Sequence, residues 1–201
     1  AREGLLTLTG ADGNRFAAYE AVPASPNGRN VVILPDVRGL HPYYEALAVR
    51  FAEAGFHAVA FDYFGRTQGA AQRPDGFDWQ SEIGTLTPEG VQSDVAASAA
   101  HLRDLNPGPT FTVGFCFGGS HSWRLSASDL DLAGVMGFYG RPPMVEDVED
   151  RFAKPLLLFV GGNDQATPVA DFRALDGRLT ERGVDHEMYV YDGAPHSFFD
   201  R

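Results

Sequence analysis

Short apolar runs alternate with longer stretches of helical periodicity along most of the chain. The runs are rich in β-branched and aromatic residues and are bounded by Gly, Pro or Asp, which is typical of buried strands. The predicted strands are Val31–Leu34, His57–Phe61, Thr110–Phe115, Gly134–Phe138, Leu156–Val160 and the more amphipathic Glu187–Tyr191. Near-continuous apolar runs indicate a parallel sheet that is covered on both faces.

Helical patterns lie between these strands. The predicted helices are Pro42–Ala54, Thr87–Leu105, Gly118–Ser128 and Pro168–Arg182. One of them has a clear start, because Thr87 suits the N-cap, Pro88 the first helical position and Glu89 the positive end of the helix dipole. Together, strands and helices predict an α/β fold with three layers and a mostly parallel, doubly wound sheet.

The first strands differ from the rest. Leu5–Thr9 and Arg15–Glu20 flank the turn Ala11-Asp12-Gly13-Asn14, so this segment predicts an antiparallel hairpin ahead of the parallel sheet. A length of 201 residues fits one domain, predicted to span 1–201. Gly65–Leu86 has no clear pattern; a lid or binding loop and a disordered surface loop are both open.

Composition narrows the classes of function. The formal net charge of −11 argues against nucleic acid and against an anionic membrane surface as partners. The chain has no apolar run of about 20 residues, so no membrane span is predicted. Ala1–Gly4 lacks a signal-peptide pattern, and the single cysteine fits a reducing compartment; we expect a cytoplasmic protein, a monomer or weak homodimer.

The candidate nucleophile is Cys116, in the motif Gly114–Gly119 between a predicted strand and a predicted helix. That context is typical of a nucleophile elbow, where glycines permit a sharp turn that exposes the reactive side chain. A helix N-terminus also favours the thiolate. The alternative is a small buried hydrophobe, the usual fate of a lone cysteine, but the elbow favours a nucleophile.

An acid and a base follow at the ends of later strands. Asp164 follows the strand Leu156–Val160, and His196 follows Glu187–Tyr191. The carboxyl ends of parallel strands share one edge of the sheet, so both side chains should lie near Cys116. The order nucleophile, acid, histidine predicts acyl transfer with His196 as the base and Asp164 as its orienter. Taken alone, Asp164 could be a turn acid and His196 a loop histidine.

The loop after the strand Val31–Leu34 contributes further candidates. Backbone N–H groups of Val37 and Phe117 are predicted to form the oxyanion hole. Asp36 is predicted to lie near the thiol and to disfavour its ionisation, with a turn residue as the alternative. Arg38 could bind an anionic substrate group or form a surface salt bridge. The histidine spacing fits no metal site, so we expect no metal and no cofactor.

Five motifs resemble the dienelactone hydrolase (carboxymethylenebutenolidase) family of the α/β-hydrolase superfamily. They are Gly114–Gly119, Phe61–Arg66, Phe138–Gly140, Gly161–Asp164 and His196–Phe198. The resemblance implies the α/β-hydrolase fold and a Cys116–His196–Asp164 triad. It also implies that an acid pairs with the resting thiol and is displaced by substrate. Asp36 stands at that position, where the well-known enzymes carry the longer glutamate.

The resemblance also bears on substrate binding. It implies an arginine in the segment Gly65–Leu86, for which Arg66 and Arg73 are candidates. The predicted substrate-binding residues are Arg38, Arg73, Trp79, Tyr139 and Ser197. Enzymes of the family that act on dienelactone carry an arginine, which binds the substrate carboxylate, where this chain has Asp200. A neutral ester, lactone or thioester is therefore predicted as a substrate at least as strongly as dienelactone itself. The family has a further helix beyond the position of Arg201; we expect it to be missing, with apolar surface exposed near the His196 loop.

The predicted function is therefore a cysteine-dependent hydrolase of small esters or lactones that forms an acyl-enzyme. A glutamine amidotransferase also uses a cysteine elbow, but it expects a His-Pro-Glu style pair where His196 is followed by Ser197 and Phe198. A non-catalytic small-molecule binding module remains the main alternative. A thiol sensor is a variant of it, weakened by the lack of a second cysteine to resolve a sulfenic acid.

Overall fold

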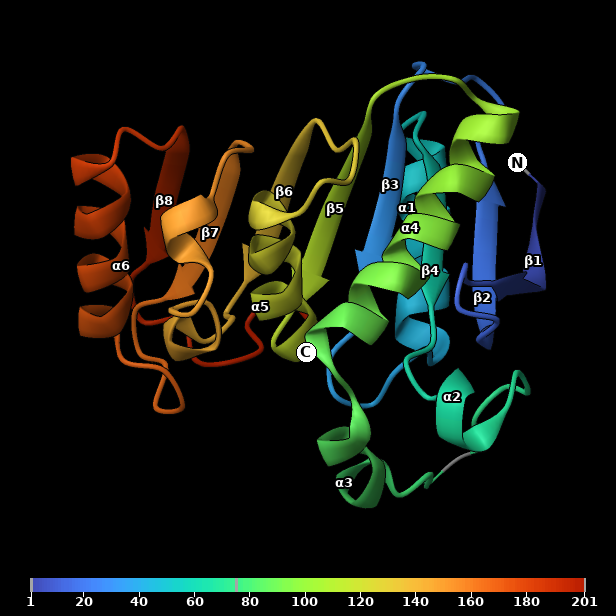
Figure 1. Ribbon diagram of the computed structural model, residues 1–201, viewed down its shortest axis with the longest axis horizontal. Helices are drawn as coiled ribbons and strands as arrows, with labels where there is room; N and C mark the ends of the chain where they lie inside the picture. The colour runs from blue at the N-terminus through green and yellow to red at the C-terminus, as the bar shows by residue number, and fades with distance from the viewer. Residues whose placement is uncertain (1, 75, 201) are drawn as a thin grey trace. The chain divides into compact units, whose positions relative to one another are not determined.

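The computed structural model describes residues 2–74 and 76–200 of the chain. It falls into two compact units, residues 1–111 and 112–201, which are described separately below. Figure 1 shows their strands and helices along the chain. The predicted α/β class with an antiparallel N-terminal pair is confirmed. The predicted single domain over 1–201 stays a prediction.

The first unit is built on the strand order β1-β2-β4-β3. Strands β1 (Arg2–Thr9) and β2 (Arg15–Val22) form the predicted antiparallel hairpin. Strand β2 pairs antiparallel with β4 (His57–Phe61), and β4 pairs parallel with β3 (Asn30–Leu34). Every residue of β3 and β4 is buried, as their continuous apolar runs predict.

Two long helices cover this sheet. Helix α1 (Pro42–Glu53) contacts β2 and β4, and helix α4 (Pro88–Leu105) contacts β3 and β4. Figure 1 shows α4 in front of these strands and α1 behind them. Helix α4 starts as predicted, because the Thr87 hydroxyl accepts a hydrogen bond from the Gly90 N–H. Its apolar stripe of Val91, Val95, Ala99 and Leu102 is buried against the strands.

The segment Gly65–Leu86 contains short helical turns. They are α2 (Gly65–Gln68), α3 (Trp79–Glu82) and a 3₁₀ turn (Ile83–Thr85). The side chains of Thr67 and Gln68 donate hydrogen bonds to Glu82, so α2 and α3 are joined. The described part of this segment is therefore structured, and its role as a lid stays a prediction.

Arg66 joins three parts of the first unit. Its guanidinium donates to Asp94 Oδ1 at 2.9 Å and to the Gly90 carbonyl at 3.0 Å, both on α4, and it also pairs with Asp12 in the hairpin turn. Asn14 donates to the same oxygen of Asp94 at 2.9 Å. Arg66, one of the candidate substrate arginines, is thus engaged by carboxylates of its own unit.

Burial raises the pKa of Asp94 to about 6 from 3.8, although hydrogen bonds from Asn14 and the charge of Arg66 oppose the rise. The folded carboxyl then binds its proton more tightly than the unfolded one. The contribution of Asp94 to the free energy of unfolding should therefore fall as pH rises from about 4 to about 6, by at most about 3 kcal/mol. Asp94→Asn should flatten this dependence in urea unfolding between pH 4 and 7. Exposed Asp104→Asn on the same helix is the control; parallel curves for Asp94→Asn and the wild type would contradict the expectation.

The second unit has the strand order β5-β6-β7-β8. Strand β5 (Thr110–Phe115) begins at the end of the first unit and leads into the second. Strands β6 (Gly134–Phe138), β7 (Leu156–Gly161) and β8 (His186–Tyr191) are parallel neighbours. The observed strands of this unit agree with the predicted ones to within one residue at each end, whereas β1 of the first unit begins three residues earlier than predicted and β2 ends two residues later.

The helices of the second unit are α5 (Phe117–Arg124), which packs on β6, and α6 (Val169–Glu181), which packs on β7 and β8. Figure 1 shows α5 in front of β6 and α6 beside β8. The prediction of one helix from Gly118 to Ser128 is wrong in part, because α5 gives way to a 3₁₀ turn at Leu125–Ala127. Further 3₁₀ turns lie at Pro142–Met144 and Glu149–Arg151. Within the described residues, no helix has the length and apolar character needed to cross a membrane.

Candidate active site

The turn between β5 and α5 holds Cys116 in a strained conformation, with φ 54° and ψ −113°. Its N–H donates to the Phe138 carbonyl at 3.0 Å, and its own carbonyl accepts from the Ser120 N–H at 3.2 Å. A Cβ at Gly114 would lie 1.9 Å from the Gly118 carbonyl oxygen, so only glycine fits there. The local geometry is that of a tight strand-to-helix elbow with the cysteine at its tip.

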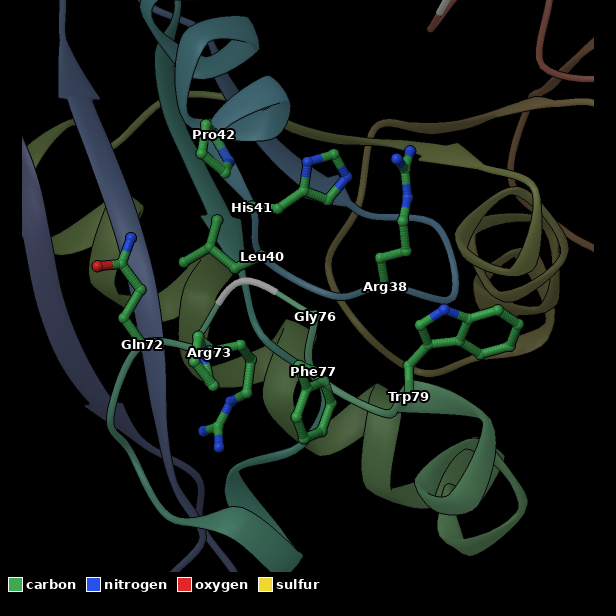
Figure 2. Close-up of a pocket in the computed structure, with 10 residues that line it drawn as sticks. Arg38, Leu40, His41, Pro42, Gln72, Arg73, Gly76, Phe77 and Trp79 are labelled. Atoms are coloured by element: carbon green, nitrogen blue, oxygen red, sulfur yellow. The ribbon is translucent and has the colours of Figure 1, made fainter.

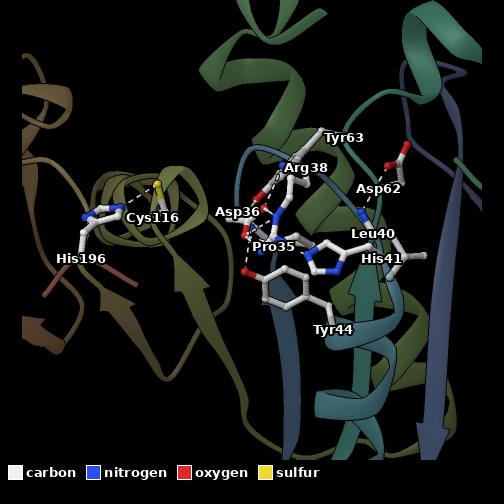
Figure 3. A network of polar contacts seen from close by, with 10 residues as sticks. All are labelled: Pro35, Asp36, Arg38, Leu40, His41, Tyr44, Asp62, Tyr63, Cys116 and His196. Carbon is white, nitrogen blue, oxygen red and sulfur yellow. Dashed lines mark hydrogen bonds and ion pairs between the residues drawn. The ribbon is translucent and has the colours of Figure 1, made fainter. Parts of the chain in front are cut away.

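The structure brings Cys116, His196 and Asp164 together within the second unit. His196 Nδ1 lies 2.7 Å from Asp164 Oδ2, and His196 Nε2 lies 3.4 Å from Cys116 Sγ. Figure 3 shows the contact between Cys116 and His196. A carboxylate only accepts hydrogen bonds, so Nδ1 carries the proton and Nε2 is the acceptor that faces the thiol. Nucleophilic catalysis requires contacts of this kind between a nucleophile, a base and an orienting acid.

Asp164 is held in place by the backbone around it. Its side chain is fully buried, and Oδ1 accepts from the N–H groups of Ala166 at 2.8 Å and Thr167 at 3.0 Å. Sequence reasoning missed these two donors, although an aspartate that bonds backbone N–H groups two and three residues on is a common turn pattern. The carboxylate is thereby left with Oδ2 directed to His196.

The loops that carry Asp164 and His196 are hydrogen-bonded to each other. They follow the parallel neighbours β7 and β8, and the Asn163 N–H donates to the Ala194 carbonyl at 2.9 Å. A Cβ at Gly161 would lie 2.7 Å from that same carbonyl oxygen, so the close approach of the two loops requires glycine. Gly161 and the parallel strands therefore set the distance between Asp164 and His196.

Two of the predicted substrate-binding residues adjoin His196. The ring of Tyr139, fully buried, lies 5.1 Å from the imidazole, centroid to centroid, at an interplanar angle of 61°. Ser197 follows His196 in a left-handed conformation, with φ 57°. Both therefore belong to the surroundings of His196.

Asp36, in the first unit, is surrounded by polar and charged groups of its own loop and of the helix α1 that follows it. Its carboxylate accepts from the Arg38 N–H at 2.8 Å and from Arg38 Nε at 3.0 Å, and His41 Nε2 lies 3.9 Å away (Figure 3). The Asp36 N–H donates to the Tyr44 hydroxyl at 3.1 Å. Burial alone would raise the pKa of Asp36, but His41 and Arg38 hold it well below its usual range. Arg38 thus forms the salt bridge that was the alternative to binding substrate.

A pocket of about 570 Å³ opens in the first unit beside this loop. Figure 2 shows Arg38, His41, Arg73, Phe77 and Trp79 among its lining residues. The pocket therefore collects three of the predicted substrate-binding residues, Arg38, Arg73 and Trp79. Sequence reasoning did not select Phe77, although it lies between Arg73 and Trp79 in the same segment.

Arg73 has internal partners at the wall of this pocket. Its Nε lies 3.2 Å from Asp62 Oδ2, and its guanidinium lies 5.6 Å from the centroid of the Phe77 ring. Its side chain is only 8% exposed, so much of its charge is already balanced by Asp62.

The predicted oxyanion hole uses one residue of each unit. Val37 lies in the Asp36 loop of the first unit, and Phe117 is the first residue of α5 in the second. The pairing of their N–H groups stays a prediction, as does the pairing of Asp36 with the thiol.

Most other histidines have local partners. His57 and His101 both lie within hydrogen-bond distance of Glu20 Oε1, at 2.9 and 2.8 Å. His186 lies 3.2 Å from Asp176. Burial, assisted by the charge of Arg124, lowers the pKa of His121 to about 4, so it is neutral at pH 7. Among residues 2–74 and 76–200, no group of three or more His, Cys, Asp or Glu side chains could hold a metal ion.

Comparisons with known proteins match nearly the whole chain. The sequence profile described as "Dienelactone hydrolase family" matches residues 16–201. A "Putative carboxymethylenebutenolidase" of Synechocystis sp. is 27% identical over 92% of this chain and 82% of its own length. A "Probable 2-oxo-3-(5-oxofuran-2-ylidene)propanoate lactonase" of Bradyrhizobium sp. is 27% identical over 95% of this chain and 82% of its own.

Solved structures show the same fold. A dienelactone hydrolase-like promiscuous phosphotriesterase from metagenomic libraries matches with a TM-score of 0.80 and 23% identity, over all of this chain and 86% of its own. An esterase of Pyrococcus furiosus matches with a TM-score of 0.73 and 16% identity, over 97% and 83% of the two chains.

Proposed function

We propose that this chain, which belongs to the dienelactone hydrolase family and is a carboxylic ester hydrolase, cleaves small esters or lactones. In this proposal Cys116 is the nucleophile, His196 is the general base and Asp164 is the acid that orients the imidazole. The observation that carries the proposal is the line of contacts from Asp164 through His196 to Cys116, at 2.7 and 3.4 Å. An elbow cysteine kept as a buried hydrophobe would not need a histidine oriented by a buried acid.

Acylation begins with transfer of the thiol proton from Cys116 to His196 Nε2. The sulfur then attacks the carbonyl carbon, and the carbonyl electron pair moves to oxygen to form a tetrahedral oxyanion. The Phe117 N–H, first in α5, is a suitable donor to that oxyanion. When the intermediate collapses, His196 returns the proton to the leaving alkoxide, and the acyl group remains on Cys116 as a thioester.

Deacylation repeats these steps with water. His196 Nε2 removes a proton from water as it attacks the thioester, and the thiolate of Cys116 leaves and is reprotonated. Throughout, Asp164 accepts the hydrogen bond from Nδ1–H and stabilises the imidazolium that forms twice in each cycle. With a lactone, the leaving alkoxide stays attached to the acyl chain, so the product is a single hydroxy acid.

The proposed substrate is a small ester or a lactone. The Bradyrhizobium relative is named as a lactonase, which favours a lactone. Asp200 follows His196 by four residues, and a carboxylate there disfavours an anionic group on the substrate nearby. A neutral ester, lactone or thioester is therefore the first class to test.

The acyl-enzyme provides the direct test. Rapid mixing of the wild type with p-nitrophenyl acetate should release a burst of about one equivalent of p-nitrophenol, followed by slower turnover. Peptide mass analysis of the quenched enzyme should place the acetyl group on Cys116. Complete alkylation by iodoacetamide should remove burst and turnover together. Turnover that survives alkylation would contradict Cys116 as the nucleophile, whereas absence of turnover in the untreated protein would favour a non-catalytic binding module.

A further inference from the structure

Backbone strain gathers at one place in this chain. Among the described residues, those other than glycine with a positive φ are Cys116, Tyr139 and Ser197. Such conformations are costly for residues with a side chain, and they persist where the surrounding structure requires them, commonly at functional sites. Cys116 is the nucleophile, and Ser197 follows the base. Tyr139, with φ 38°, is the third, and it has no step in the mechanism above.

The segment around Tyr139 contacts both halves of the catalytic pair. On one side, the Phe138 carbonyl accepts the Cys116 N–H at 3.0 Å. A Cβ at Gly140 would lie 2.8 Å from the Ser120 nitrogen of α5, so the segment runs close against that helix. On the other side, the Tyr139 ring lies against the imidazole of His196. Tyr139 is therefore fixed to the element that carries the nucleophile and touches the base.

Tyr139 is held rigidly in this position. Its side chain is fully buried, and its N–H donates to the Phe159 carbonyl at 2.8 Å. Its ring also packs edge-to-face on Phe198, with centroids 5.4 Å apart. A ring that is packed on several sides and anchored through its backbone can act as a fixed wall for its neighbour.

The imidazole of His196 needs such a wall. Its contacts with Asp164 and Cys116 fix two points on the ring, at Nδ1 and Nε2. They do not fix rotation of the ring about the line through those points, nor displacement of the ring away from the thiol. From this geometry we infer that Tyr139 is a positioning residue, whose ring holds the imidazole of His196 in line between Asp164 and Cys116. The inference rests on the proposed function and gives Tyr139 a role other than binding substrate.

The test compares Tyr139→Leu with Tyr139→Phe, which keeps the ring. Phe172→Leu is the control, because it removes a fully buried ring of the same unit that packs on Trp123. Tyr139→Leu should lower kcat for p-nitrophenyl acetate about 10- to 100-fold, with KM changed less than about threefold, because a base displaced by about 1 Å transfers protons poorly. Tyr139→Phe, which keeps the ring, should retain most of the wild-type kcat. Phe172→Leu should leave kcat near the wild-type value.

A second readout does not depend on turnover. The pH profile of Cys116 alkylation by iodoacetamide reports the coupling of the thiol to His196. Tyr139→Leu should move this profile toward that of His196→Ala, whereas Tyr139→Phe and Phe172→Leu should follow the wild type. If Tyr139→Leu does not fold, as judged by circular dichroism, Tyr139→Met replaces it, because methionine fills the space without a ring.

Three outcomes would overturn the inference. A rise in KM at constant kcat would make Tyr139 a substrate contact. An unchanged alkylation profile in Tyr139→Leu would show that the ring does not position His196. Equal losses in Tyr139→Phe and Tyr139→Leu would assign the effect to the hydroxyl group. Absence of turnover in the wild type would instead contradict the proposed function, and the alkylation profiles would still decide on Tyr139.

Discussion

Replacing Cys116 by alanine should lower kcat/KM for p-nitrophenyl acetate by about 10⁴-fold or more, because removal of a triad nucleophile leaves only the residual catalysis of substrate binding and the oxyanion donors. Alanine removes the sulfur but retains the Cβ and the strained elbow around it. His196 then has no proton to accept at Nε2 and no nucleophile to activate. Spectrophotometric assay with p-nitrophenyl acetate measures the loss, and rapid mixing should show no burst.

Cys116→Ser provides the matched variant. It places a hydroxyl group where the thiol lies 3.4 Å from His196 Nε2 in the wild type, but an alcohol is far less acidic than a thiol. We expect the serine variant to retain a small part of the activity and to resist iodoacetamide. Turnover in Cys116→Ala above about a tenth of the wild-type rate, in a sample that gives the wild-type circular dichroism spectrum, would rule out the triad as the source of catalysis.

The α/β-hydrolase fold could be predicted from the chain, because its strands are unambiguous. The runs His57–Phe61 and Leu156–Val160 are apolar without a break, and they form β4 and the greater part of β7. Relatives and solved structures confirm the predicted fold and family. Helices α1 and α4 could be predicted as well, because each has a long apolar stripe and a proline at its start.

The short helices of the segment Gly65–Leu86 could not be predicted from the sequence. Helices of four residues have no measurable period and are unstable alone, so side-chain contacts decide whether they form. Here Glu82 of α3 accepts hydrogen bonds from Thr67 and Gln68 of α2. Asp62 binds Arg73 in the same way, at a distance of 11 residues along the chain. None of these pairs leaves a signal in hydrophobic patterning.

The candidate site also contains residues that could be predicted from the sequence and contacts that could not. Cys116, Asp164 and His196 could be selected from the sequence, because each follows a predicted strand and parallel strands end at a common edge. The partners of Asp36 could not be predicted, because the hydrogen bonds from Arg38 depend on how the loop closes over two residues. The contact between Tyr139 and His196 could not be predicted either, because it depends on the left-handed backbone conformation of Tyr139 just after β6.

Asp164→Asn should lower kcat by about 10² to 10⁴-fold, because it reverses the tautomer of His196. In the wild type, Oδ2 accepts the proton of Nδ1 at 2.7 Å, which leaves Nε2 without a proton and facing the thiol. An asparagine can keep its oxygen on the N–H groups of Ala166 and Thr167, and its NH₂ group then faces Nδ1. Nδ1 must accept, the proton moves to Nε2, and the base can no longer take a proton from Cys116.

Asp192→Asn is the matched control for this change. It removes the same charge from an exposed acid of the neighbouring loop, between β8 and His196, without altering the hydrogen bonds of the imidazole. If the loss in Asp164→Asn came from net charge alone, the two variants would lose activity alike and high salt would reduce the difference from the wild type. A tautomer effect predicts instead a large loss in Asp164→Asn only, insensitive to salt. Because the fully buried Asp164 lies at hydrogen-bond distance from the ring, we expect the second pattern.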